Sequence, residues 1–259
     1  LPRDFERETE RRYPLRVEIG GFGSRYTGVR WMMSGMSRFR AAWLADDAPR
    51  MILVKLDGAG PLGDPYQVNS DNNGPYGDAI MQELIPHIEK TYRGIGEGWA
   101  RVLHGGSTGG WVALALQVFY PEYFNGCWSF CPDPVDFRSY QVVNIYEDAN
   151  AYEGPDGKER PSARDPATGR TRYTIRQECA VENVLGPGDS YTRSGGQWGA
   201  WNATFSPRGE DGQPLPLWDP VTGAIDRATA KRWARYDLRR HLEANWAEVG
   251  PLLRGKIRI

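Results

Sequence analysis

A serine set among small residues, Gly105-Gly106-Ser107-Thr108-Gly109, is the feature of this sequence that points most clearly to covalent chemistry. A serine hydroxyl becomes a nucleophile when a base accepts its proton and hydrogen-bond donors stabilise the oxyanion that forms. A sharp turn from a strand into a helix exposes such a serine, and small residues two positions before and after it let the backbone fold tightly. Gly105 and Gly109 fill these positions, so the pattern predicts Ser107 as a catalytic nucleophile. The alternative is a glycine-rich turn in which the serine only caps the helix.

Backbone amides near this turn are the candidate oxyanion donors. The amide of Thr108 lies at the start of the predicted helix, where the helix dipole favours negative charge. A second donor is expected from the loop after an earlier strand. The sequence Gly20-Gly21-Phe22-Gly23 follows a predicted strand at 15–19 and fits that place. The amide of Phe22 is the first choice in this loop, and an ordinary tight turn is the alternative.

Three further residues are candidates for binding the substrate. Gly21 and Gly23 lack side chains, so the backbone beside them can approach a ligand closely. Asn73 lies in a polar loop, residues 69–78, that follows a predicted strand at 51–56. Ligands of open α/β sheets bind at the carboxyl ends of the strands, and we therefore expect this loop to border the pocket.

The sequence offers few partners for the serine, because it contains only three histidines. His104 lies too close to the serine on the same strand, His87 lies within a predicted helix, and His241 lies in a later helix. The last of these could reach the site only if the later part of the chain folded over it as a lid. For the acid, Asp133 and Asp136 follow a predicted strand, and Asp133 is the weak candidate within this chain. An aspartate in a proline-rich turn is the equally good alternative.

Strands and helices alternate through the first half of the chain. Apolar runs predict strands at 15–19, 51–56, 101–103 and 124–130. Apolar residues at helical spacing predict helices at 26–39, 78–92 and 109–120, with a kink at Pro86. This alternation is typical of α/β proteins that have one mainly parallel sheet with helices on both faces.

The alternation ends after the last of these strands, and turn signals dominate the rest of the chain. One amphipathic helix is predicted there, at 226–249, and residues 256–259 have the pattern of a strand that has just begun. We therefore expect a core at 1–131, a cap-like insert at 132–255 and the start of a further core strand at 256–259. The tryptophans of the insert either line a lid that grips a sugar or aromatic acyl group, or bury its long loops. Burial is the favoured interpretation.

The overall composition argues against several classes of protein. The 32 basic and 33 acidic residues balance, so no net field favours nucleic acid or an anionic membrane. No apolar run is long enough to span a membrane, and no cluster of His, Cys and carboxylates has metal-ligand spacing. The three cysteines do not read as a disulfide framework, and no cofactor is indicated. The sequence favours neither a cytoplasmic nor a secreted location, and it leaves the oligomeric state open.

Several motifs together resemble the "putative esterase" family of α/β-hydrolases, which includes esterase D-like enzymes, feruloyl esterases and mycolyltransferases. The motifs are Tyr13-Pro14, the turn at 20–23, Leu56-Asp57-Gly58, the segment 83–89 and the segment 105–111. Their order and spacing match the family over about residues 12–137. The resemblance implies the α/β-hydrolase fold and serine-dependent cleavage of carboxylic esters through an acyl-enzyme, without a cofactor. The implied substrate is a small-molecule or carbohydrate-linked ester.

The sequence departs from the family pattern at two points. The residue before the nucleophile is often His in the family and is Gly106 here, at a position that usually packs rather than reacts. Triad order in this fold is serine, acid, histidine, and no suitable histidine follows Ser107. We therefore expect the chain to be a fragment whose triad acid and histidine lie beyond Ile259. Two rival hypotheses are acyl transfer on the same fold and a catalytically inactive binding protein that kept the fold.

Overall fold

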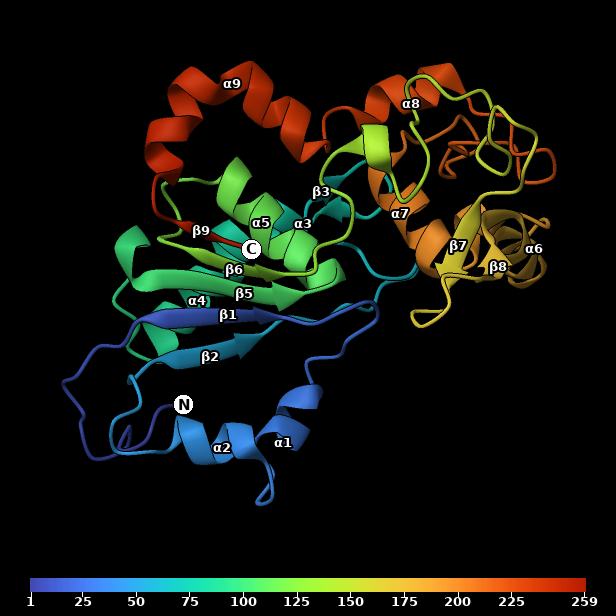
Figure 1. Cartoon of the computed structure of the whole chain (residues 1–259). Coiled ribbons are helices and arrows are strands. Elements are labelled where there is room, and N and C mark those ends of the chain that lie inside the picture. Colours follow the sequence, from blue (N-terminus) through green and yellow to red (C-terminus); the bar gives the residue numbers. More distant parts are fainter. The chain divides into compact units, whose positions relative to one another are not determined.

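A sheet of five parallel strands organises the chain, in the order β2-β1-β5-β6-β9 (Figure 1). The computed structural model describes all 259 residues. The strands are β1 (Leu15–Ile19), β2 (Ile52–Lys55), β5 (Arg101–Gly106), β6 (Cys127–Phe130) and β9 (Ile257–Arg258). The predicted parallel sheet is confirmed by this pairing.

Two compact units make up the chain. The first unit holds the sheet and consists of Leu1–Ala59, Tyr76–Asp133 and Trp246–Ile259. The second unit consists of Gly60–Pro75 and Pro134–Asn245. Along the chain, one segment of the second unit follows the carboxyl end of β2 and the other follows the carboxyl end of β6. In parallel sheets these ends carry the ligand-binding loops.

Two helices cover one face of the sheet. α5 (Thr108–Phe119) packs against β5 and β6, and the hydroxyl of Ser129 donates to the carbonyl of Gly110 at 2.8 Å. α4 (Ile85–Thr91) contacts the same face, because Glu89 forms a buried ion pair with Arg101 at 2.7 Å. The strands alternate buried residues on this face with half-buried or exposed residues on the other. The buried side chains of the strands therefore face α4 and α5, and the turn at Ser107 leads from β5 into α5 on this face.

Two helices predicted in the first unit differ from those observed. The predicted helix at 26–39 is wrong, because the structure has α1 (Gly28–Met32) and α2 (Arg38–Trp43) with a break between them. No residue of α1 is buried, so tertiary packing does not support a longer helix there. The predicted helix at 78–92 is observed as α3, a π-helical stretch η1 and α4. These pieces are α3 (Tyr76–Asp78), η1 (Ala79–Leu84) and α4 (Ile85–Thr91).

Pro86 explains the interruption of this second helix. It lies at the start of α4, lacks an N–H and crowds the turn before it. The amide of Ile85 accordingly donates to the carbonyl of Ile80, five residues earlier, as in a π-helix. The predicted kink is therefore observed as a widened helix ahead of the proline.

The second unit contains more helix than the sequence predicts. Its helices are α6 (Ile175–Leu185), α7 (Gln197–Phe205), α8 (Arg227–Trp233) and the first part of α9 (Leu238–Leu253). Its hairpins pair β3 (Asn69–Ser70) with β4 (Gly74–Pro75) and β7 (Pro161–Arg164) with β8 (Thr171–Thr174). Short 3-10 turns are η2 (Gly98–Ala100) in the first unit, and η3 (Phe137–Ser139) and η4 (Tyr191–Arg193) in the second. The turn-rich segment is thus a folded unit with its own elements.

The single helix predicted at 226–249 is wrong, because α8 and α9 are separate. Asp237 lies between them and is fully buried. Its carboxylate accepts hydrogen bonds from the amide of Phe137 and the hydroxyl of Tyr146, each at 2.9 Å. These bonds hold the break in place. α9 is interrupted again at Asn245, where φ is −120° and ψ is 15°.

Aromatic side chains form the core of the second unit. Trp198, Trp201, Trp218 and Trp233 are each at most 4% exposed. Tyr140 packs against all four, with ring centroids 5.3 to 6.3 Å apart. Burial of the tryptophans is therefore confirmed for these four. Trp246, which also falls within the predicted insert at 132–255, belongs to the first unit and is 60% exposed.

Candidate active site

Ser107 occupies a strained turn between β5 and α5. Its φ of 58° and ψ of −126° lie outside the regions that a residue with a side chain favours, and the side chain is exposed. Holding one residue in such a conformation costs about 1–3 kcal/mol, and it persists only where the surrounding structure fixes it. Here the amide of Ser107 donates to the carbonyl of Phe130 at 2.9 Å, and the amide of Trp111 donates to the carbonyl of Ser107 at 3.1 Å. The turn is thus anchored on both sides.

The glycines around the serine differ in how much room they have. A Cβ on Gly105 would lie 2.0 Å from the carbonyl oxygen of Gly109, and a Cβ on Gly109 would lie 2.2 Å from the oxygen of Ile19. Both positions therefore accept only glycine without movement of the backbone. A Cβ on Gly106 would make its nearest contact at 3.7 Å, which is ordinary packing. The small-residue requirement thus applies two positions from Ser107 and not to Gly106.

The predicted oxyanion loop lies beside the serine. A Cβ on Gly21 would lie 3.7 Å from the Cβ of Ser107. The amide of Ser24 donates to the carbonyl of Gly21 at 2.9 Å, which closes a tight turn, and Gly23 has a φ of +66° that favours glycine. Phe22 lies at the tip of this turn, is exposed, and its amide makes no hydrogen bond within the chain. The structure thus brings the loop and the nucleophile together.

Residues after β2 hold this loop in place, among them Asp57 and Gly58 of the motif Leu56-Asp57-Gly58. The amide of Gly58 donates to the carbonyl of Ser24 at 2.7 Å, and Arg25 pairs with Asp57 at 2.7 Å. The ammonium of Lys55 would lie 3.2 Å from a Cβ on Gly20. The loop is therefore tied to the end of β2, and the polar residues directly after that strand are the signal that could have indicated it.

Thr108 and Asp133 are joined by a hydrogen bond. The hydroxyl of Thr108 donates to the Asp133 carboxylate at 2.9 Å. Thr108 is buried at the first position of α5, so this bond ties the chain after β6 to the elbow. Asp136, the other acid considered, caps the short turn η3 and pairs with Arg138. The structure therefore gives Asp133 a role in supporting the elbow.

The hydroxyl of Ser107 makes no hydrogen bond in the structure. The ring of His104 turns instead to Glu18, with 3.0 Å between Nδ1 and Oε2, and packs on Phe130. Burial alone would raise the pKa of Glu18, but its contacts with His104 and Arg16 outweigh the burial, and its pKa is lowered. His104 therefore contacts Glu18 and not the serine.

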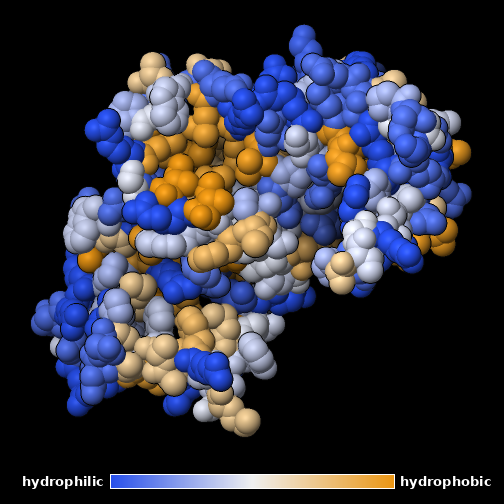
Figure 2. Space-filling model, viewed as in Figure 1, coloured by the Kyte–Doolittle hydropathy of each residue, from blue (hydrophilic) through white to orange (hydrophobic).

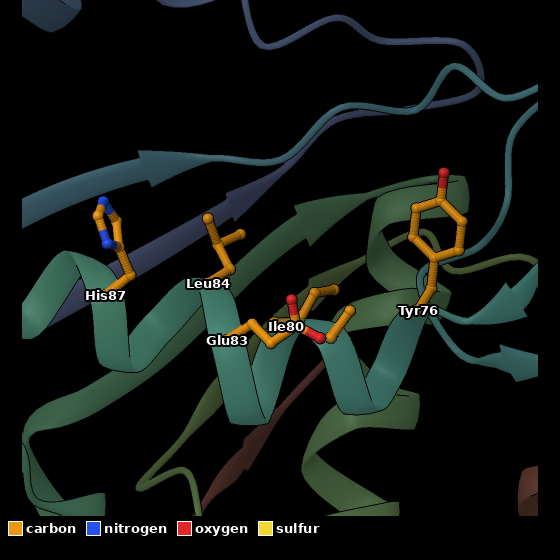
Figure 3. Close-up of a pocket in the computed structure, with 6 residues that line it drawn as sticks. Tyr76, Ile80, Glu83, Leu84 and His87 are labelled. Carbon is orange, nitrogen blue, oxygen red and sulfur yellow. The ribbon is translucent and has the colours of Figure 1, made fainter.

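The other two histidines lie on helices. His87 is exposed on α4, where Tyr76, Leu84 and His87 follow one side of the helical stretch along an open groove of about 600 Å³ (Figure 3). His241 belongs to the second unit, lies on α9, and has its pKa lowered by partial burial. Asn73, proposed to border the pocket, also belongs to the second unit, where its side-chain amide donates to the hydroxyl of Thr204 at 3.1 Å.

A second cavity lies on the face of the sheet opposite α4 and α5. It has a volume of about 260 Å³ and is lined by Arg16, Met51, Val102, His104, Trp128 and Phe130. Ser107 lines neither this cavity nor the groove on α4. No group of three or more His, Cys, Asp or Glu side chains is arranged to hold a metal ion. None of the helices has the length and hydropathy needed to cross a membrane.

A family model and several solved structures match the chain. The family described as "Esterase: Putative esterase" matches residues 64–248, more than two thirds of the chain and including the elbow. No curated protein sequence matches it. Among solved structures, a ferulic acid esterase is similar at 22% identity with a TM-score of 0.41, over 57% of this chain and 63% of that one.

Two further structures show a comparable degree of similarity. An S-formylglutathione hydrolase from Agrobacterium tumefaciens is 19% identical with a TM-score of 0.41, over 54% of this chain and 52% of that one. A fluorophosphonate-binding serine hydrolase from Staphylococcus aureus is 12% identical with a TM-score of 0.38, over 52% and 50%. The chain thus spans between half and two thirds of the length of these proteins.

Proposed function

Because the chain belongs to the putative esterase family, we propose that it is a serine-dependent hydrolase of carboxylic esters with Ser107 as its nucleophile. The parallel sheet, with the serine turn between β5 and α5, has the arrangement of the α/β-hydrolase fold. The observation that carries the proposal is the strained, exposed conformation of Ser107, fixed by Gly105 and Gly109. A serine that only capped a helix would have no need of a backbone that costs about 1–3 kcal/mol to maintain.

The proposed reaction follows from the positions around this serine. The Ser107 oxygen attacks the ester carbonyl carbon as its proton passes to a base, and the carbonyl oxygen becomes an oxyanion. The amides of Thr108 and Phe22 receive that oxyanion, one from the start of α5 and one from the tip of the loop after β1. Loss of the alcohol leaves an acyl-enzyme, which water then cleaves. Because Gly21 and Gly23 have no side chains, a substrate can approach the backbone of this loop closely.

We also propose that the second unit acts as a cap that selects the substrate. Its two segments follow the carboxyl ends of β2 and β6, and Ser107 follows the carboxyl end of β5. Loops at this edge of a parallel sheet are where binding specificity usually lies. Asn73 belongs to the shorter of these segments and is the proposed polar contact. The expected substrate is a small-molecule or carbohydrate-linked ester.

The test compares the turnover of short nitrophenyl esters by the protein and by two serine variants. Ser107→Ala is expected to lower kcat by about 10⁴-fold or more, because the nucleophile of a triad acts as a unit with its partners. Ser139→Ala is the matched control, since Ser139 is exposed and its hydroxyl makes no hydrogen bond. Circular dichroism checks that both variants fold. Measurable turnover that is retained in Ser107→Ala contradicts the proposal, and transfer of the acyl group to an added alcohol identifies an acyltransferase instead.

A further inference from the structure

The segment that follows the oxyanion loop contains large apolar residues but has no core. No residue from Gly20 to Ala42 is buried. The segment nevertheless holds three of the five methionines of the chain. Trp31 is 79% exposed and Met36 is 99% exposed. Single exposed apolar residues are normal, but a contiguous group of them indicates a surface that contacts another phase or molecule.

The same segment carries positive charge that is not balanced locally. Four arginines lie between Gly20 and Ala45, and no acidic residue does. One of them, Arg25, pairs with Asp57. The side chains of the other three make no ion pair or hydrogen bond within the chain. These three are Arg30, Arg38 and Arg40. A local charge of this sign is unexpected in a chain whose formal net charge is −1.

The base of the segment is anchored, whereas its tip is not. Trp43 at the end of α2 is nearly buried, donates to the carbonyl of Leu1 and stacks on Phe39 with ring centroids 5.6 Å apart. The chain between α1 and α2 carries Met36 and projects away from the sheet (Figure 1). In Figure 2 this end of the first unit shows pale orange side chains interspersed with blue ones. The exposed apolar and cationic side chains of the segment therefore lie together on a part of the chain that is anchored at Trp43.

We propose that residues 25–40, here called the interfacial segment, bind the surface of an anionic lipid layer. Tryptophan and methionine side chains enter the boundary between headgroups and acyl chains, and arginines contact the phosphates above it. Charge complementarity indicates an anionic lipid surface as the partner, because the three arginines without an ion-pair partner match a negative surface. Docking through this segment would hold the protein by the loop that follows β1, next to Ser107.

The test measures co-sedimentation of the whole chain with vesicles of phosphatidylcholine doped with phosphatidylglycerol, and with vesicles of phosphatidylcholine alone. We expect binding to the anionic vesicles that weakens as salt is added, because salt screens exposed charges. Removing three arginine charges (Arg30→Gln, Arg38→Gln and Arg40→Gln together) should weaken it roughly 100-fold, equivalent to about 2.8 kcal/mol. Trp31→Ser with Met36→Ser should weaken it by about tenfold or more through lost apolar burial.

Matched variants separate this site from general effects of charge and hydrophobicity. Trp99→Ser removes a tryptophan that is 64% exposed elsewhere in the first unit. Replacing three other exposed, unpaired arginines by glutamine changes the net charge by the same amount; these are Arg164, Arg170 and Arg254. Both controls should bind anionic vesicles like the wild type.

Three outcomes would overturn the proposal. One is the absence of binding to the anionic vesicles. Another is an equal loss of binding in the control variants. The third is self-association that Trp31→Ser with Met36→Ser abolishes while vesicles have no effect, which assigns the segment to a second copy of the chain. Because vesicle binding is measured without a substrate, the result does not depend on the proposed esterase activity.

Discussion

The steric demand of the elbow leads to a prediction that a single methyl group can test. In Gly109→Ala, the new Cβ would lie 2.2 Å from the carbonyl oxygen of Ile19 and 2.4 Å from that of Gly20. Ordinary contact would require the end of β1 and the oxyanion loop to move by about 1 Å. Alanine is favoured over glycine within a helix by about 1 kcal/mol, whereas overpacking typically costs about 1–3 kcal/mol. Because both clashing atoms belong to the backbone, we expect the upper end of that cost and a net loss of about 2 kcal/mol.

Gly106→Ala is the matched control for this change. Its Cβ would make no contact closer than 3.7 Å, and its φ is not positive, so we expect stability equal to that of the wild type or slightly above it. Urea unfolding followed by circular dichroism should show the difference between the two variants. A displacement of about 1 Å at the oxyanion loop should also lower ester turnover by about 100-fold in Gly109→Ala. Equal stability of the two variants would refute the steric account of the elbow.

Further predictions concern Asp133, the three cysteines and Glu18. Asp133→Asn should lower stability by about 1 kcal/mol through its weakened bond to Thr108 and should change turnover only a few-fold, whereas a triad acid would lose about 10⁴-fold in kcat. A thiol reagent should modify the exposed Cys131 in the native protein and the two buried cysteines only after unfolding, since burial raises the pKa of one of them to about 11; rapid modification of all three contradicts this. Glu18→Gln should lower the free energy of unfolding at neutral pH. The pKa of Glu18 is lowered in the folded state, so its contribution is present above the unfolded value of about 4.3 and is lost as pH falls through the folded pKa. Urea unfolding of wild type and variant should therefore converge in acid, and a constant difference would contradict the lowered pKa of Glu18.

The parallel sheet and the elbow could be predicted from the sequence because both follow from local rules. Apolar runs separated by amphipathic stretches permit few arrangements other than a parallel sheet. The position of Gly105 and Gly109 around Ser107 reflects a contact between residues four apart, which the sequence displays directly. The position of the loop at 20–23 beside Ser107 could also be predicted, since the loop after an earlier strand lies at the same edge of the sheet as the serine.

The second unit could not be predicted in the same way. Its core consists of aromatic residues whose contacts join distant positions, such as Tyr140 with Trp218 and Trp233. Helical periodicity identifies a helix that has one apolar face, but nearly every residue of α7 is buried, so it shows no such face. In α6 the capping box formed by Thr174 and Gln177 is a local signal for the start of the helix. At the break, Asp237 accepts from the amide of Arg240 at 3.0 Å, as an N-cap does, which is a local signal. Its bonds to Phe137 and Tyr146 join positions almost a hundred residues apart and have no such signal.

Covalent labelling tests the central claim most directly. A fluorophosphonate reacts with an activated serine, and mass spectrometry of the digested protein identifies the modified residue. The account predicts one adduct on the peptide that contains Ser107 and none in Ser107→Ala. An adduct on another serine, or labelling that persists in Ser107→Ala, would contradict it.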